Sequence, residues 1–397
     1  MSFNMRSTNT LLVLMVGMSS TLIGIGLSRF AFTPLIPMLS SEGWFSVVET
    51  SYLGSLNLLG YLIGALSAHR LAQQVGDRLL LTVAALVVSV SYFVCFLPIH
   101  YLWVAGWRVL AGVAGGHLMV IGPAFALLHS HKNYRNAVMT MIFMGIGLGV
   151  VLSSAIIPLL LRFSLSIIWL AIGSLSLCIS AVMIFGLRQL PAISHSSLSS
   201  EPSSSFAIGA VWLVIAAYAL DAAGFIPHTI FWVDYLVRER NFTQPQALWL
   251  WFAFGGGCLS GPLIAKWLVS QLSWHRALWV AYALKAFAIL LPVLTAMPVL
   301  LFCSAFIVGA LTPGIVALTA GRIAELVGTT RHQYYWGRAT AGFALLQALS
   351  GWGMSFYYQK VGEYAPLFIT AALLMLFALL CISASPFFRS KSVKQSC

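Results

Sequence analysis

Long apolar stretches alternate with short polar segments along almost the whole chain. About twelve of these stretches have the roughly 20 residues that a helix needs to cross the hydrocarbon layer of a membrane. They form two sets of six, with the longest internal polar stretch, RQLPAISHSSLSSEPSSSF, between them. The first set covers roughly 11–39, 48–68, 79–98, 101–128, 136–161 and 165–187. The second covers roughly 207–234, 246–268, 276–296, 298–321, 336–358 and 364–385.

This pattern predicts an all-α membrane protein with twelve transmembrane helices in two pseudo-symmetric six-helix bundles. The N-terminal bundle is expected to cover residues 1–187, and the C-terminal bundle residues 207–397 with a short basic cytoplasmic tail. The Ser- and Pro-rich segment 188–206 is typical of a flexible linker, here cytoplasmic. The first apolar stretch is too long for a signal peptide and no A-x-A-like site follows it, so we interpret it as the first span.

The composition excludes a soluble protein. Hydrophobic residues make up 60% of the 397 positions and charged residues only 8%, against about 25% charged in ordinary soluble domains. A disordered chain is excluded for the same reason. The bilayer is therefore an expected partner.

The distribution of positive charge predicts the orientation in the membrane. A net charge of +12 would suggest nucleic-acid binding in a soluble protein. With the N-terminus in the cytoplasm, however, the cytoplasmic side receives 14 of the 21 Lys and Arg residues, the outer side 4, and the spans 3. This bias follows the positive-inside rule. It predicts a multi-pass protein of the inner (cytoplasmic) membrane with both termini in the cytoplasm, and no nucleic-acid partner is needed.

Short motifs recur at a fixed distance along the chain. The second stretch is followed by Gly64-Ala-Leu-Ser-Ala-His, and the eighth stretch is followed by the similar Gly261-Pro-Leu-Ile-Ala-Lys. The two motifs are 197 residues apart, and the same offset relates Gly112 to Gly309. The repeat indicates two related halves. Parallel repeats of this kind place a substrate site near the middle of the membrane, between the halves.

Four segments carry a resemblance to a known family. They are GIGLSRFAFTPLIP (24–37), NLLGYLIG (57–64), RVLAG (108–112) and RATAGFALLQ (338–347). The chain resembles the major facilitator superfamily, and the first segment is similar to its YbfB/YjiJ-type branch. The resemblance implies alternating access around a midplane site built from helices 1, 4, 7 and 10.

Two positions depart from the superfamily pattern. Ala68 stands where the loop between helices two and three usually has Asp, and the fifth helix, with GIGLG at 145–149, lacks the Gly-Pro pair of the antiporter motif. The usual charge contact of that loop is therefore not expected here, and the fifth helix does not point to antiport.

Ionisable residues inside the spans are candidate functional residues, because a charge in the hydrocarbon layer is costly. Arg29 in the first span and Arg108 in the fourth stay charged, so we predict that they bind an anionic or polar group of a substrate. The alternative is that each clamps helices through backbone carbonyls or Asn57. Asp221, deep in the seventh span, is predicted to carry a coupling proton; its alternative is a static ion pair with Arg29, Arg108 or Lys285.

The seventh span presents one face that is polar and aromatic. At about 100° per residue, His228 lies about 20° from Asp221, and Phe225 and Trp232 share that face. This spacing predicts a cavity wall on which His228 assists Asp221 and the aromatic rings contact substrate; the alternative for His228 is a bond to a carbonyl. Phe32 in the first span is a further candidate for apolar contact.

Two other ionisable residues are weaker candidates. His117 could join the proton path, but it follows Arg108 by nine residues, which places it about 180° around a straight helix. The glycines between them are better suited to close helix packing. Because the resemblance puts the ninth helix on the periphery, we expect Lys285 to extend toward the interface or to pair locally.

These features favour a secondary active transporter that moves a small organic solute by alternating access, coupled to protons. Export is preferred on resemblance alone, and a monomer is expected. A uniporter of the same fold and a non-transporting membrane sensor or scaffold remain as alternatives. No P-loop, H-E-x-x-H or G-x-S-x-G motif occurs, so an ATP-driven pump or an enzyme is not expected. The six scattered cysteines predict no metal site, and no cofactor is expected.

Overall fold

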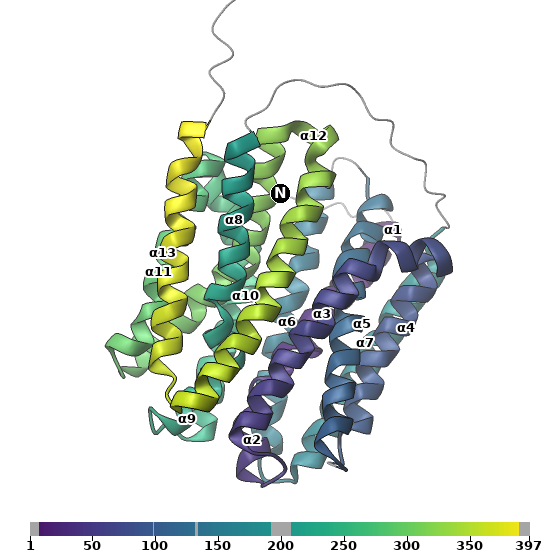
Figure 1. Cartoon of the computed structure of the whole chain (residues 1–397). Coiled ribbons are helices and arrows are strands. Elements are labelled where there is room, and N and C mark those ends of the chain that lie inside the picture. The colour runs from purple at the N-terminus through teal and green to yellow at the C-terminus, as the bar shows by residue number, and fades with distance from the viewer. Residues whose placement is uncertain (1–7, 98, 132–133, 192–207, 389–397) are drawn as a thin grey trace, which may run out of the picture.

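The computed structural model describes residues 8–97, 99–131, 134–191 and 208–388. Within these ranges the regular structure is helical throughout, without a strand, and the long helices run side by side (Figure 1). The first half of the chain contains α1 (Thr8–Thr21), η1 (Leu22–Leu27), η2 (Phe30–Phe32), α2 (Leu35–Ser41), α3 (Val47–Val75), α4 (Asp77–Val94), α5 (Tyr101–Leu128), α6 (Arg135–Leu160) and α7 (Leu165–Gln189). The second half contains α8 (Ile208–Gly224), η4 (Pro227–Phe231), α9 (Trp232–Arg238), α10 (Gln244–Gln271), α11 (Trp274–Leu294), α12 (Pro298–Val361), α13 (Ala365–Ala384) and η5 (Ser385–Phe388).

The helices of the two halves occupy opposite sides of the molecule. In Figure 1 the purple and blue helices α1–α7 lie on one side and the teal to yellow helices α8–α13 on the other. Contact between the sides is made mainly by α6 with α10 and by α3 with α12. The predicted linker lies outside the described residues from position 192 onward, and so does the predicted basic tail from position 389.

Ten helical segments of the described chain are long and apolar enough to cross a membrane. The remaining two of the twelve expected stretches, 48–68 and 336–358, fall on α3 and on the part of α12 that follows a change of direction at Gly328 (φ 75°). Both helices are long, but polar side chains such as Asn57 and Gln347 lower their mean hydropathy. Apolarity alone therefore identifies ten candidate spans, and it does not identify α3 or the part of α12 after Gly328.

The start points of the helices repeat along the chain. The helices α3, α4 and α5 begin at residues 47, 77 and 101, and α10, α11 and α12 begin 197 residues later at 244, 274 and 298. The caps repeat as well, because Ser46 with Glu49 and Thr243 with Gln246 each form a capping box. The offset inferred from two short motifs thus extends over three consecutive helices in each half.

Close helix packing repeats at the same offset. A Cβ at Gly60 on α3 would collide with the carbonyl oxygen of Val109 on α5, and a Cβ at Gly257 on α10 would collide with the carbonyl oxygen of Phe306 on α12. Only glycine permits such an approach of two backbones. The helix pairs α3–α5 and α10–α12 therefore use one packing arrangement twice.

Hydrogen bonds join the two halves near the turns that follow α2 and α9. In this region, Ser55 of α3 bonds the Gly351 carbonyl oxygen and the Ser355 hydroxyl of α12, each at 2.8 Å, and Tyr52 donates to Gln359 at 2.9 Å. Two further bonds, from Thr33 to the Thr229 carbonyl oxygen and from Arg238 to Ser40, lie in the same region. We call this region, formed by residues 33–55 of the first half and by 229–244 and 351–364 of the second, the closed end.

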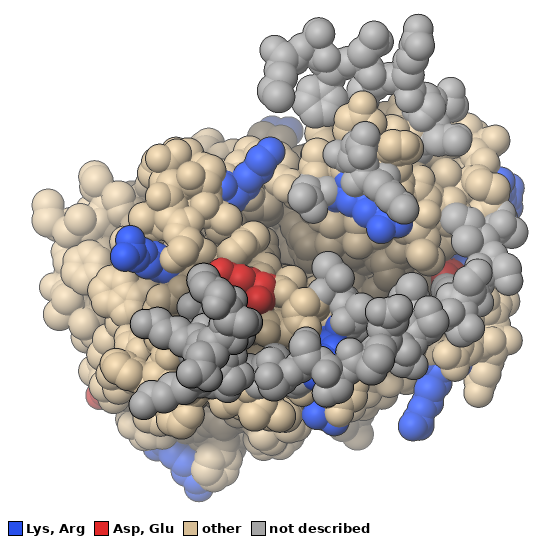
Figure 2. Space-filling model, turned by 90° about the horizontal axis from the view of Figure 1, so that it is seen from above, with Lys and Arg blue, Asp and Glu red and all other residues tan. Residues whose placement is uncertain are grey.

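The opposite end of the molecule is open toward its centre. Figure 2 views that end, at the top of Figure 1, and shows a surface that is hollowed between the two sides. More Lys and Arg than Asp and Glu are visible on this face (Figure 2). The structure thus combines contact between the halves at the closed end with a recess at the other.

Candidate functional site

A break in the first span positions the first arginine. The helix α1 continues as the π-helical turn η1, and the short 3-10 helix η2 follows. Arg29 lies between η1 and η2. Pro34, which has no backbone N–H, follows directly and limits any continuation of the α-helical bonding pattern. Irregular turns of this kind inside long helices are frequent at functional sites.

The guanidinium of Arg29 is buried without an acid beside it. The residue is 8% exposed, and its Cζ atom lies 5.1 Å from the ring centre of Phe30 and 5.6 Å from that of Phe225. Its Nε and Nη2 atoms have no hydrogen-bond partner. The aromatic faces provide cation–π attraction, which leaves the N–H edge of the guanidinium available.

Arg108 on α5 has a similar environment. It is 2% exposed, its Cζ atom lies 4.1 Å above the ring of Phe32, and its side chain bonds Tyr92. Its Nε atom has no partner. Asn57, the clamp considered from the sequence, donates at 3.1 Å to the backbone carbonyl oxygen of Arg108 and so ties α3 to α5.

Both arginines line one small internal cavity at the junction of the two halves. The space between its atoms is about 220 Å³ in total. Most of this space is too narrow for a water molecule, and the cavity has room for about one water. The remaining lining residues are Phe32, Thr33, Ile36, Gly54, Leu58, Thr229 and Ile230. The structure therefore brings Arg29, Arg108 and Phe32 together, as the sequence predicted for a binding site.

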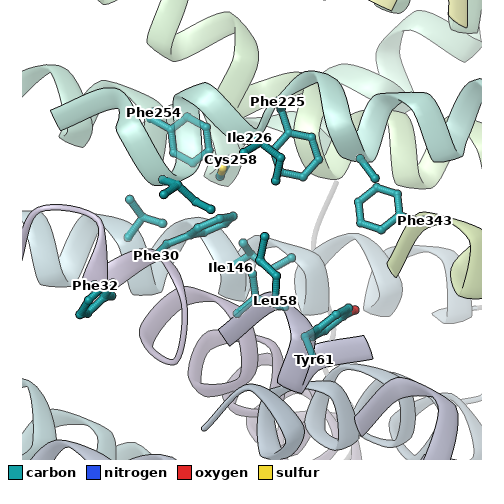
Figure 3. Close-up of a cluster of buried hydrophobic side chains, with 14 of the residues drawn as sticks. Phe30, Phe32, Leu58, Tyr61, Ile146, Phe225, Ile226, Phe254, Cys258 and Phe343 are labelled. Atoms are coloured by element: carbon teal, nitrogen blue, oxygen red, sulfur yellow. The ribbon is translucent and has the colours of Figure 1, made fainter. Parts of the chain in front are cut away.

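Aromatic residues from both halves surround this region. Figure 3 shows Phe30 directed across the junction toward Phe254, while Phe32 points in a different direction. The rings of Phe30 and Phe254 meet edge to face with centres 5.5 Å apart. Phe225, on the opposite side of the junction, stacks near Phe343 at 6.0 Å. The sequence analysis missed Phe30, although its position next to a buried arginine was a usable signal.

Asp221 and Lys285 form an ion pair inside the second half. The Lys285 Nζ atom lies 2.6 Å from Oδ1 of Asp221, and both side chains are 0% exposed. Lys285 also lies 4.6 Å from the ring centre of Phe225, so this ring contacts both Lys285 and Arg29. The second oxygen of Asp221, Oδ2, has no hydrogen-bond partner.

Two environments were expected for Lys285, extension toward the interface or a local pair. The residue is completely buried on α11 and donates to Asp221 on α8, so its side chain does not extend toward the interface. Of the pairings left open for Asp221, the structure selects the one with Lys285. A peripheral helix can still turn a single side chain inward, and helix order alone does not reveal that.

His228 and Trp232 do not share a surface with Arg29. The His228 ring stacks on Trp232 at 4.6 Å and meets Phe368 of α13 at 5.3 Å, and its Nε2 atom lies 2.9 Å from the hydroxyl of Ser304 on α12. The expected common face assumed a straight α-helix. The π-helical turn η4 lies between Asp221 and Trp232 and changes the rotation per residue, so both rings turn toward the interior of the second half.

His117 also lies apart from the arginines. Its Nε2 atom is 2.9 Å from the hydroxyl of Ser67 on α3, whereas Arg108 on the same helix reaches Phe32 and Tyr92. The expected half-turn between the two residues is compatible with this arrangement. In this structure His117 is not part of the cavity lining.

Polar groups at the closed end form a connected cluster. Asp234 accepts from Arg238 Nε at 2.8 Å and from the hydroxyl of Tyr364, and Arg238 also donates to Ser40 of the first half. The backbone N–H of Tyr364 donates at 2.6 Å to Glu239. Partial burial raises the pKa of Glu239, and that hydrogen bond opposes the rise. The cluster fixes Arg238 where it contacts the other half.

The long apolar helices and the buried charged side chains near the centre define a multi-pass membrane protein. Comparison with protein families agrees with this class and makes it specific. A family described as uncharacterised MFS-type transporter YbfB matches residues 21–382. The chain therefore belongs to this family of major facilitator transporters, which confirms the resemblance noted in the first helix. Transporters of this superfamily are generally not enzymes.

Proposed function

We propose that this chain is a secondary active transporter that moves a small organic solute by alternating access between two six-helix bundles. In this proposal α3 and the part of α12 after Gly328 also cross the membrane, which makes twelve spans. The bundles are residues 1–187 and 207–397. The repeated helix starts and the repeated glycine packing support two related units.

The proposed orientation places both termini in the cytoplasm of a cell with an inner membrane. It rests on the excess of Lys and Arg predicted for that side. The closed end then faces outward, and the hollowed face of Figure 2 faces the cytoplasm. The structure would accordingly represent a state whose recess faces the cytoplasm, in which the hydrogen bonds of Ser55 and Arg238 close the outer route and the small cavity at the arginines is not yet open to solute.

The proposed substrate site is the junction around Arg29 and Arg108, with Phe32 and Phe225 as apolar contacts. Both guanidinium groups are buried and line one cavity, which supports a role in binding an anionic or polar group. Trp232 and His117 are not included in the proposed site, because their rings pack on other helices.

The proposed proton carrier is Asp221, with Lys285 as its partner. The observation that carries the proposal is their fully buried contact at 2.6 Å, beside the ring that also contacts Arg29. A proton taken up by Asp221 removes the negative charge that holds Lys285. Its release restores the pair, so one proton switches one buried contact. His228 is proposed to assist this proton transfer. Its imidazole lies within the electrostatic influence of Lys285, and its Nδ1 atom has no hydrogen-bond partner.

Proteoliposomes with an imposed pH gradient test this function. The solute is first identified by a screen for compounds that raise the melting temperature of the purified protein. The parent is expected to accumulate that solute against its gradient when protons flow. Asp221→Asn is expected to exchange solute without accumulation, and Glu42→Gln, which changes an exposed acid, should behave as the parent.

The alternatives give different results in the same experiment. Solute flux without proton movement in the parent would identify a uniporter. Binding without any flux would identify a sensor or scaffold. If Asp221→Asn couples as well as the parent, Asp221 is not the proton carrier.

A further inference from the structure

The interior around the cavity carries two positive charges that no acid among the described residues offsets. Arg29 and Arg108 are both buried, and arginine does not lose its proton in proteins. The ionisable groups that act on them are Tyr61 for Arg29, and Tyr92 and Cys95 for Arg108. All three are side chains without charge at neutral pH. The third buried cation nearby, Lys285, is already paired with Asp221.

Each acidic residue of the chain can be assigned to another place. Asp221 pairs with Lys285, Asp234 with Arg238, and Glu325 with Arg322. The others cap helices, lie in turns, or fall outside the described residues: Glu49 in the cap of α3, Asp77 in the first turn of α4, Glu239 on the backbone of Tyr364, Glu42 and Glu363 exposed in turns, and Glu201 in the part that is not described. No carboxylate in the described chain lies beside either arginine of the cavity.

The aromatic rings do not replace an anion at this site. The guanidinium carbon of Arg29 lies over the rings of Phe30 and Phe225, and that of Arg108 lies over the ring of Phe32. The hydrogen-bonding groups of a guanidinium lie along its edge, in its plane. The unpartnered Nε and Nη2 of Arg29 and Nε of Arg108 are such edge groups. They lack a hydrogen-bond acceptor, and a carboxylate supplies one together with the negative charge that offsets a guanidinium.

We infer that this cavity binds an organic dianion of the dicarboxylate class, with one negative charge for each unpaired arginine. The inference rests on the proposed transport function and specifies its substrate. The short carbon chain between the carboxylates would lie against Phe32, Leu58 and Ile230, which line the same cavity. Cations are disfavoured there by the two like charges. Because the cavity now holds about one water, the two halves must separate around the arginines to admit the solute.

Thermal stabilisation of the purified protein tests the inference. The probes are succinate, glutarate and adipate, compared with butyrate and valerate, with the uncharged diamides of the same acids, with a diamine, and with inorganic phosphate and sulfate. At least one dicarboxylate is expected to raise the melting temperature at a concentration tenfold or more below that needed for its monocarboxylate or diamide counterpart.

Matched variants locate the effect. Arg29→Gln and Arg108→Gln should each abolish the stabilisation, and Arg162→Gln, which changes an exposed arginine, should retain it. Arg29→Lys keeps the charge without the fork and is expected to retain a weakened response. This variant keeps the test informative if Arg29→Gln does not fold.

Three outcomes overturn the inference. In the first, diamides, monocarboxylates or diamines raise the melting temperature as much as any dicarboxylate does. In the second, the dicarboxylate still raises the melting temperature fully in the Arg29 and Arg108 variants. In the third, phosphate or sulfate raises the melting temperature as much as the dicarboxylate. The proposed transport function fails separately, if a compound that stabilises the protein crosses no proteoliposome membrane. A neutral solute that is transported would refute the dianion and leave the transporter intact.

Discussion

Breaking the ion pair between Asp221 and Lys285 should destabilise the protein strongly, whereas removing both charges should not. Both side chains are 0% exposed and the charged atoms are 2.6 Å apart. Loss of one partner leaves an unpaired charge in an interior that water does not reach, at a cost of about 3–5 kcal/mol. If the effects of Asp221→Asn and Lys285→Met were additive, the double variant would lose about 6–10 kcal/mol, comparable to the whole stability of many proteins.

The double variant is instead expected to be at least as stable as either single variant. It contains no unpaired ion, and replacing a buried pair by neutral groups is often without cost. The measurement is the unfolding midpoint of each purified variant in detergent, followed by tryptophan fluorescence. Glu42→Gln is the control, because this carboxylate is exposed in the turn that follows α2, where charge interactions contribute about 0–1 kcal/mol.

The pH dependence of the two single variants should have opposite signs. In Lys285→Met the remaining carboxylate can become neutral by taking up a proton, so its destabilisation should decrease as the pH falls. In Asp221→Asn the remaining amine can become neutral by releasing a proton, so its destabilisation should decrease as the pH rises. A double variant as unstable as the sum of the single variants, or single variants with the same pH trend, would refute this account of the pair.

Two further predictions concern the packing of the halves and their contact. Gly257→Val should lower the melting temperature and the yield of monodisperse protein, because its Cβ collides with the Phe306 carbonyl oxygen, while Gly353→Ala, with open space around it, should not. A Gly257→Val protein as stable as the parent would contradict the packing described. Arg238→Gln removes the bond to Ser40 and should increase hydrogen exchange in α2 and α9 several-fold, measured by mass spectrometry on peptides from these helices. Unchanged exchange there would show that the bond does not hold the closed end.

The fold was predictable from the sequence to the extent that hydropathy and length decide it. The apolar stretches correspond to helices, and the offset of 197 residues between Gly64 and Gly261 extends to the starts of whole helices. Hydropathy was least informative for α3 and for the part of α12 after Gly328. Ser55 and Asn57 of α3 bond other helices, whereas the buried Gln347 of α12 has no hydrogen-bond partner, and hydropathy identifies neither segment as a candidate span.

The candidate site was predictable only in part. Burial of Arg29, Arg108 and Asp221 followed from their positions within apolar stretches. The partner of Asp221 did not, because Lys285 is 64 residues away and reaches it only because α8 and α11 both pack on α12 and α13. The contacts of His228 with Ser304 and Phe368 did not follow either, because they depend on the packing of helices far apart in the chain.

The sequence by itself determined that lipid surrounds this protein and that Arg29, Arg108 and Asp221 lie within its interior. Both conclusions follow from how each residue type is solvated in water or in lipid. That preference can be read from a residue and its neighbours in the sequence. Only the tertiary structure decided which of these groups are neutralised and which remain unpaired, and at which end the halves meet. Those properties depend on distances between residues far apart in the chain, and a few ångströms separate an ion pair from an isolated charge.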